Sequence, residues 1–222
     1  MKGTRNRIEY VDIAKIVGMF LIVYGHILRG GRVTTWIYTF HVPLFFFLSG
    51  ITFHGNETNF GYFIRKKAKC LLVPFFVWSL ISTAVYIVLA RVIPSQMVLE
   101  TNVADTARSI LMGYCEANSP LWFLPCLFIV ELLLWGIAKV ESRNGKVVYL
   151  GVVAVSLIVC AAWPIFKEKE IFWNIHNAFI LLPFAISGYL FGKYIEKTNV
   201  SIKNISIAAI LVTGGGYGRY IV

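Results

Sequence analysis

Apolar residues run through this chain in blocks of about 20 residues, and short polar segments separate the blocks. A block of that length crosses a hydrocarbon core about 30 Å thick when it folds as an α-helix. The core of a soluble domain would instead break such blocks with turns and amphipathic stripes. The pattern therefore predicts an all-α, polytopic transmembrane helix bundle of about seven spans, at 10–29, 34–54, 71–90, 120–138, 147–165, 175–192 and 204–222.

Composition supports a membrane protein. Hydrophobic residues make up 58% of the chain and charged residues only 14%, whereas soluble domains carry about 25% charged residues. A net charge of +10 can indicate nucleic-acid binding, but here the basic residues lie in short loops, and neither an RNP-like motif nor a basic duplex-reading helix is present. We therefore expect contacts with the lipid bilayer and no nucleic acid. The four cysteines form no C-x-x-C pair, so no metal site is expected.

The basic residues also predict the orientation in the membrane. With the N-terminus inside, the inner segments hold 13 Lys and Arg residues and the outer loops hold six. Basic residues concentrate on the cytoplasmic side of membrane proteins. We therefore expect a multi-pass protein of the plasma (inner) membrane whose N-terminus is cytoplasmic.

The predicted spans form a single membrane domain over residues 1–222. A basic cytoplasmic loop is expected at 55–70 and an outer loop at 91–119, in which the stretch Val103 to Tyr114 could form a short amphipathic helix on the membrane surface. Four glycines between residues 214 and 218 weaken the last block as a helix, at about 1 kcal/mol each relative to Ala. The chain then stops at Val222 without a polar tail, which predicts a domain truncated at its C-terminus.

Three ionisable residues fall within the first apolar block. Helical geometry places Asp12, Lys15 and His26 on one stripe, beside which Gly18 and Gly25 would let another helix approach closely. Ionisable groups inside spans are costly and are functional candidates by default. A neutral His26 could act as a general base, and the alternative is a solvated histidine at the membrane interface. Asp12 lies about 21 Å of helical rise away, too far to orient His26 directly.

Further polar groups interrupt later spans. His41 and Pro43 fall within the second block, where a structural hydrogen bond is the simpler interpretation of His41. Glu131 lies in mid-span and must face the bundle interior or a wet cavity. Ser49, Glu131 and Asn177 are candidates for orienting His26, and the sequence does not choose among them.

Two other features have both a structural and a functional interpretation. Arg65, Lys66, Lys67 and Lys69 precede the third span, where they could be an inside anchor or could bind the phosphates of a ligand. Trp122 lies near the outer interface, where aromatic residues commonly form a belt, and together with Asn177 it is a candidate for positioning a substrate.

Five stretches, in order, resemble the acyltransferase-3 family of membrane O-acyltransferases (fucose 4-O-acetylase-like). They are Tyr10 to Lys15 running on to Gly25-His26, Phe40 to Gly50, Lys67 to Pro74, Leu121 to Pro125, and Leu182 to Tyr189. The resemblance implies transfer of an acyl group, usually acetyl from acetyl-CoA, to hydroxyls of surface carbohydrates, with His26 matching the catalytic histidine. Family members often have two arginines three apart before the third span, whereas this chain has Lys67 and Cys70. They also have several more spans.

The resemblance and the residues suggest one mechanism. The basic segment would hold the CoA phosphates, the pantetheine arm would enter between helices, and His26 would deprotonate a sugar hydroxyl or carry the acyl group itself. A non-catalytic flippase or transporter of polysaccharide or lipid is the alternative, although the inverted repeats that it predicts are not apparent in the sequence. An inactive fragment is a third interpretation.

Overall fold

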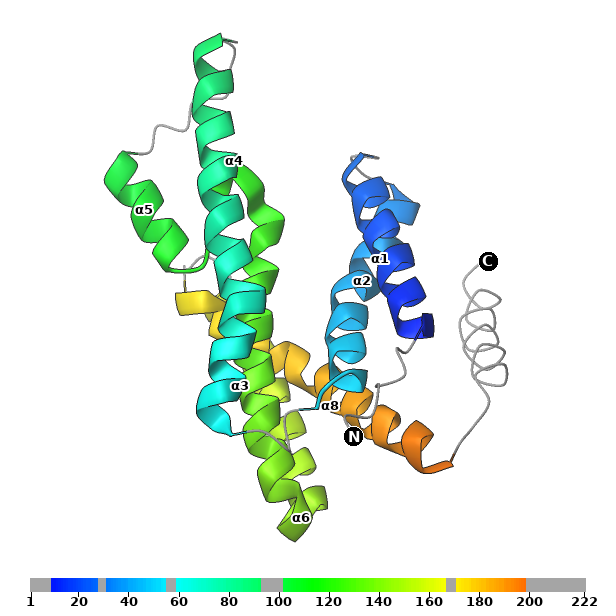
Figure 1. The fold of residues 1–222 in the computed structure, drawn as a ribbon. Helices are drawn as coiled ribbons and strands as arrows, with labels where there is room; N and C mark the ends of the chain where they lie inside the picture. The colour runs from blue at the N-terminus through cyan, green and yellow to red at the C-terminus, as the bar shows by residue number, and fades with distance from the viewer. Residues whose placement is uncertain (1–8, 28–30, 55–58, 93–101, 167–170, 199–222) are drawn as a thin grey trace, which may run out of the picture.

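The computed structural model describes residues 9–27, 31–54, 59–92, 102–166 and 171–198, and within these ranges it contains helices and no strand (Figure 1). The elements are α1 (Glu9–Ile27), α2 (Arg32–Ile51), α3 (Phe60–Lys67), the π-helical turn η2 (Ala68–Leu72), α4 (Val73–Val92), α5 (Val103–Leu111), the 3₁₀ segment η3 (Glu116–Trp122), α6 (Phe123–Ala161), α7 (Trp163–Phe166), the 3₁₀ turn η4 (Phe172–Asn174) and α8 (Ile175–Thr198). The predicted all-α fold is confirmed.

Four helical stretches of the described chain are long and apolar enough to cross a membrane. They are Arg32–Ile51, Phe60–Val92, Val103–Val140 and Phe172–Lys197, and they contain the predicted spans at 34–54, 71–90, 120–138 and 175–192 to within a few residues. The predicted span 147–165 corresponds to a shorter apolar helix, Gly145–Ala161. Helix α1 covers residues 10–27 of the span predicted at 10–29, and residues 28–29 and the block 204–222 lie outside the described residues. The chain is thus a membrane protein, and the count of seven spans stays a prediction.

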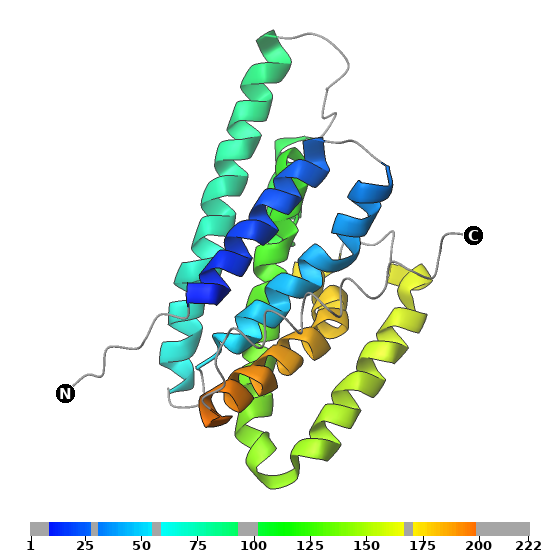
Figure 2. The same ribbon diagram turned by 90° about the vertical axis from the view of Figure 1, so that its right-hand side faces the viewer.

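Helix α8 runs obliquely across the bundle and makes the two most extensive helix contacts, with α2 and α6 (Figures 1 and 2). Between these three helices lies the main apolar core, which includes Phe46, Cys126, Leu134, Ala185 and Tyr189. Figure 2 also shows α6 turning back on itself at its lower end, so that its C-terminal arm rises beside α8. The turn lies in the polar segment after Val140, and this segment separates the two predicted spans.

Close contact between α2 and α8 depends on glycine. A Cβ atom added to Gly50 would overlap the backbone carbonyl oxygen of Ala185, and one added to Gly188 would overlap that of Phe47. A Cβ atom added to Gly192 would lie 2.9 Å from the backbone carbonyl oxygen of Ile51, a milder overlap. Small residues at such crossings let helices pack in a membrane, where lipid is as apolar as the side chains. We call Gly50, Gly188 and Gly192 the glycine seam.

A serine satisfies a carbonyl that proline leaves without a partner in α8. Pro183 has no N–H group, so the carbonyl of Phe179 loses its helical donor. The hydroxyl of Ser156, on the returning arm of α6, lies 2.6 Å from this carbonyl oxygen and 2.8 Å from that of Val152. The contact therefore ties the returning arm to α8 while tolerating a proline within a span.

Helix α1 packs along α2 through the residues that the sequence singled out. Val11 is buried against the lower part of α2, and a Cβ atom on Gly18 would lie 3.0 Å from the Phe45 ring. Gly25 faces Ile37 near the other end of the pair. The predicted close approach at both glycines is confirmed.

The basic segment is helical from Phe60 on, which corrects the described part of the loop predicted at 55–70. Asn59 caps α3 by accepting a hydrogen bond from the amide of Gly61 at 2.9 Å. Phe63 is buried, with its ring 5.8 Å from that of Phe53 and 6.4 Å from that of Trp135. Capping and burial outweigh the mutual repulsion of the cations, so α3, η2 and α4 form one long helix from Phe60 to Val92.

Candidate functional site

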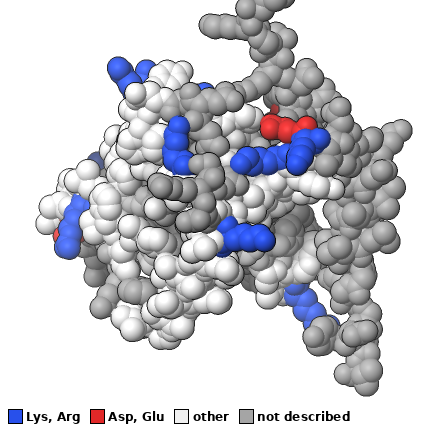
Figure 3. All heavy atoms as spheres, turned by 90° about the horizontal axis from the view of Figure 1, so that it is seen from below, with Lys and Arg blue, Asp and Glu red and all other residues white. Residues whose placement is uncertain are grey.

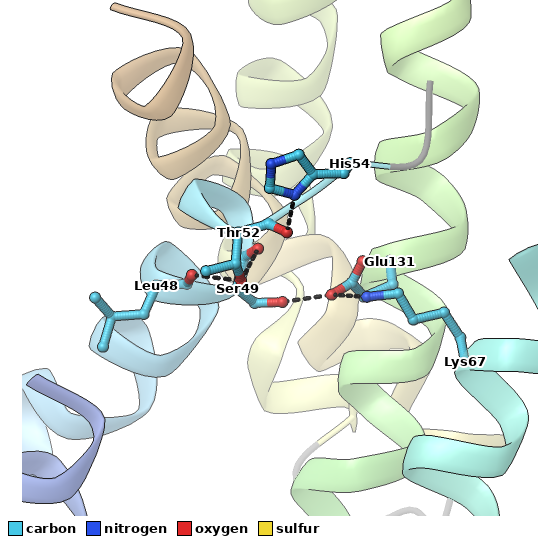
Figure 4. Close-up of polar contacts among 6 residues, drawn as sticks. All are labelled: Leu48, Ser49, Thr52, His54, Lys67 and Glu131. Atoms are coloured by element: carbon cyan, nitrogen blue, oxygen red, sulfur yellow. Dashed lines mark hydrogen bonds and ion pairs between the residues drawn. The ribbon is translucent and has the colours of Figure 1, made fainter. Parts of the chain in front are cut away.

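A buried polar cluster joins three helices at the level of Glu131 (Figure 4). One carboxylate oxygen of Glu131, Oε1, accepts a hydrogen bond from the Ser49 hydroxyl at 2.5 Å and lies 2.9 Å from the Lys67 ammonium group. Ser49 comes from the last turn of α2, Lys67 from the end of α3 and Glu131 from α6. The predicted inward orientation of Glu131 is therefore confirmed.

The burial of this cluster explains why it has a lysine in it. The Glu131 side chain is only 4% exposed and the Lys67 side chain 25% exposed. An unpaired carboxylate at that depth would cost several kcal/mol, and ionisable groups inside membrane proteins usually pair with one another. The Lys67 ammonium group also lies 5.6 Å from the centre of the Phe63 ring. Glu131 Oε2 is buried without a hydrogen-bond partner, so the cluster retains one acceptor.

Lys67 therefore has a partner other than the expected phosphate group. Its ammonium group neutralises Glu131, whereas the side chains of Arg65, Lys66 and Lys69 are exposed on the same helical segment. Figure 3 views this end of the molecule and shows separate Lys and Arg side chains around a largely uncharged surface. Lys66 and Lys69 are three residues apart and so share a face of the helix. Three cations, and not four, are available to a ligand here.

His41 makes the hydrogen bond that its simpler interpretation required. It is buried in α2, and its Nδ1 lies 2.9 Å from the carbonyl oxygen of Ile37. Because a carbonyl only accepts, Nδ1 carries the proton, and a neutral ring keeps Nε2 as an acceptor. The Tyr38 ring packs against the imidazole at 5.3 Å. This arrangement supports a packing role for His41.

The structure separates the buried cluster from the level of His26. Gly25 lies beside Ile37, and Ser49 follows Ile37 by twelve residues, or about 18 Å of rise along α2. Ser49 and Glu131 therefore bond to each other and to Lys67 and are not placed to orient His26. The His26 side chain lies outside the described residues, so its catalytic role stays a prediction. Asp12 and Lys15 lie half-buried on α1.

A second cluster surrounds a cavity of about 280 Å³ beyond the first turns of α6 and α8. The two residues predicted to position a substrate, Trp122 and Asn177, both line it, although 55 positions separate them. The complete lining is Tyr114, Cys115, Glu116, Ser119, Trp122, Asn174 and Asn177. Asn177 donates a hydrogen bond from Nδ2 to Asn174 Oδ1 at 3.3 Å, so its amide is engaged at this cavity.

Sequence reasoning missed Asn174 and the pairing of Lys67. Asn174 is buried and its backbone is left-handed, with φ of 53°. An asparagine just before an apolar block is a weak signal, because Asn is common at turns and helix starts. The need of Glu131 for a cation was readable from the sequence, but the choice of Lys67 depends on tertiary packing. Among the described residues, no group of three His, Cys, Asp or Glu side chains could hold a metal ion.

Comparison with known proteins identifies a family and a related protein. Residues 8–221 match the profile of the acyltransferase-3 family, described as an acyltransferase domain. The chain is 24% identical over 212 residues to nodulation protein NolL of Mesorhizobium japonicum, an alignment that covers 89% of this chain and 51% of the relative. The chain thus spans about half the length of that curated relative, and no solved structure matches it significantly. Since the family profile covers nearly all of its residues, the chain belongs to the acyltransferase-3 family.

Proposed function

We propose that this chain is the membrane part of an O-acyltransferase that moves an acetyl group from acetyl-CoA to a hydroxyl of a cell-surface or exported carbohydrate. The observation that carries the proposal is the family match over residues 8–221. Two features of the fold support it. Exposed cations lie at one end of the α3–α4 helix, and a cavity lined by aromatic and amide side chains lies beyond the N-terminal ends of α6 and α8.

The exposed cations suit the donor. Coenzyme A carries several phosphate charges, and Arg65, Lys66 and Lys69 project from the segment where α3 passes into η2. π-helical turns inside α-helices frequently occur at functional sites. The basic asymmetry of the sequence supports a cytoplasmic location for this end of the bundle, at the plasma membrane, where acyl-CoA is available. The pantetheine arm would then cover the roughly 18 Å of rise between the level of Ser49 and that of Gly25.

The chemistry requires one base and one leaving group. In the proposed reaction His26 takes the proton of the acceptor hydroxyl, whose oxygen attacks the thioester carbonyl. The C–O bond forms, the C–S bond breaks, and the imidazolium returns its proton to the CoA thiolate, so the histidine is regenerated. A transient acyl group on His26 gives the same products in two steps.

The donor site is tested by replacing Lys66 and Lys69 with Gln in the full-length protein. We expect the KM for acetyl-CoA to rise about tenfold, since two screened cation–phosphate contacts are worth about 1.4 kcal/mol together. The remaining affinity should depend less on salt. Measurement of CoA release at several ionic strengths checks both effects, and an unchanged KM would leave these lysines as a topology anchor only.

Lys67→Gln is the matched control. It removes one charge, where the test variant removes two, within two residues of both Lys66 and Lys69, but it leaves Glu131 buried without its cation. We expect a lower melting temperature and less protein in the membrane, with the donor KM of the folded fraction unchanged. Adding Glu131→Gln should restore most of the lost stability, because the double variant buries no unpaired charge. A tenfold rise in donor KM for Lys67→Gln alone would show that Lys67, too, contacts the donor.

A further inference from the structure

We infer that the cavity beside Trp122 and Asn174 is a carbohydrate subsite that holds one sugar ring of the acceptor. The inference rests on the proposed function and deepens it. At about 280 Å³ the cavity falls just below the 300–1,000 Å³ that drug-sized ligands occupy, so it fits one ring and not an extended glycan. Trp122 supplies an apolar face, and Asn174, Asn177 and Glu116 supply donors and acceptors for hydroxyl groups.

The buried amide of Asn174 is the strongest indication of a ligand. The residue is 4% exposed, and its Nδ2 has no hydrogen-bond partner. Its Oδ1 accepts a hydrogen bond from Asn177 at 3.3 Å, and its Nδ2 is the donor left without a partner. Leaving a buried donor unsatisfied is unfavourable, and a hydroxyl oxygen of a ligand in the cavity would remove that cost.

The surrounding chain holds Asn174 in an unusual conformation. Trp173 and Asn174 both have positive φ, at 49° and 53°, a region that non-glycine residues rarely occupy. Several contacts impose it. The Trp173 amide donates to the Met112 carbonyl at 2.8 Å, its indole N–H donates to the Leu111 carbonyl at 3.1 Å, and the Tyr114 hydroxyl bonds both backbone groups of Ile171. The segment after α5 thereby clamps the segment before α8 and keeps the Asn174 amide at the cavity.

The charge of the cavity distinguishes the acceptor from the donor. Its described lining contains Glu116 and no Lys or Arg, so it disfavours the phosphates of CoA and suits a neutral polyol. The subsite therefore binds the acceptor and not the donor.

The test compares Asn174→Asp with Asn118→Asp in the full-length protein. Asp keeps the size of Asn174, its tolerance of positive φ and an oxygen for Asn177, and it removes the Nδ2 donor. Asn118 is adjacent to the lining residue Ser119, lies outside the cavity lining itself and donates to Ser82 Oγ at 3.1 Å, so it controls for a lost amide. The probes are methyl glycosides of neutral hexoses, 6-deoxyhexoses and N-acetylhexosamines. Binding is followed by saturation-transfer NMR in nanodiscs and turnover by acetyl transfer from acetyl-CoA.

We expect Asn174→Asp to weaken the binding of the best glycoside and to raise the KM for that glycoside about tenfold, with kcat and the KM for acetyl-CoA unchanged. Asn118→Asp should leave glycoside binding, both KM values and kcat near those of the wild type. If the wild-type protein bound a glycoside, Asn174→Asp weakened that binding, and no acetyl transfer were detected, the proposed function would be contradicted and the sugar subsite would be supported. Acetyl transfer whose acceptor KM is unaffected by Asn174→Asp would remove the subsite and keep the proposed function. Failure of every glycoside to bind the wild-type protein would overturn the subsite outright.

Discussion

His26→Gln in the full-length protein is expected to lower the rate of acetyl transfer by roughly 10²–10⁴-fold, the usual contribution of a general base. Gln keeps a side chain of similar reach that can donate and accept hydrogen bonds, but it cannot take a proton at neutral pH. The backbone of residue 26 lies in the last turn of α1, next to Gly25, where α1 packs on α2. Protein level and melting temperature should therefore change little while turnover is lost.

The control for this variant is His41→Gln. His41 is buried, and its Nδ1 hydrogen bond to the Ile37 carbonyl is part of the packing of α2. We expect less protein in the membrane, with turnover per folded molecule largely kept. Near-normal turnover of His26→Gln, measured as acetyl product per mole of folded protein, would contradict the catalytic role of His26 and return it to an interfacial residue.

Gly188→Ala is expected to destabilise the helix bundle by about 1–3 kcal/mol or more, the cost of overpacking a tight core. The added methyl group would overlap the Phe47 carbonyl oxygen, and a backbone atom cannot rotate away as a side chain can. Helices α2 and α8 would have to separate along the glycine seam, which would also loosen the core formed with α6. Gly50→Ala should destabilise the bundle in the same way, because its added methyl group would overlap the Ala185 carbonyl oxygen.

Gly136→Ala is the matched control. An added Cβ atom at Gly136 has nothing within 4 Å, and Ala is favoured over Gly in a helix by about 1 kcal/mol. Thermal unfolding in detergent should show a lower melting temperature for Gly188→Ala and an equal or higher one for Gly136→Ala. If both variants had the melting temperature of the wild type, α2 and α8 would not be in the close contact described.

Much of the fold follows from the sequence because each apolar block is a local feature. Block length predicts a membrane helix without reference to any other part of the chain. The depth of Glu131 could be read in the same way, as could the helix within the outer segment, which the structure places at Val103–Leu111. The prediction of a loop before the third span was wrong because the sequence shows the charges of this segment directly. The Asn59 cap and the burial of Phe63, which stabilise the helix, become apparent only in the structure.

The candidate site was less predictable because its contacts are long-range. The ion pair of Lys67 and Glu131 joins residues 64 positions apart, and the glycine seam depends on how α2 crosses α8. Trp122 and Asn177 lie in different apolar blocks of the sequence, and only the tertiary fold shows that they share a cavity. Asn174 escaped notice because its left-handed backbone and its unpartnered amide are properties of the folded chain.

The proposed passage of acetyl groups from cytoplasmic acetyl-CoA to a carbohydrate hydroxyl can be measured in sealed, inside-out membrane vesicles that contain the full-length protein. Acetyl-CoA labelled in its acetyl group is added outside, where the cytoplasmic face is exposed. We predict labelled, base-labile acetyl esters on carbohydrate, formed in step with the release of free CoA and absent with His26→Gln. Release of CoA without acetylated carbohydrate would contradict acetyl transfer to carbohydrate, and equal labelling of carbohydrate with His26→Gln would contradict the role of His26 in it.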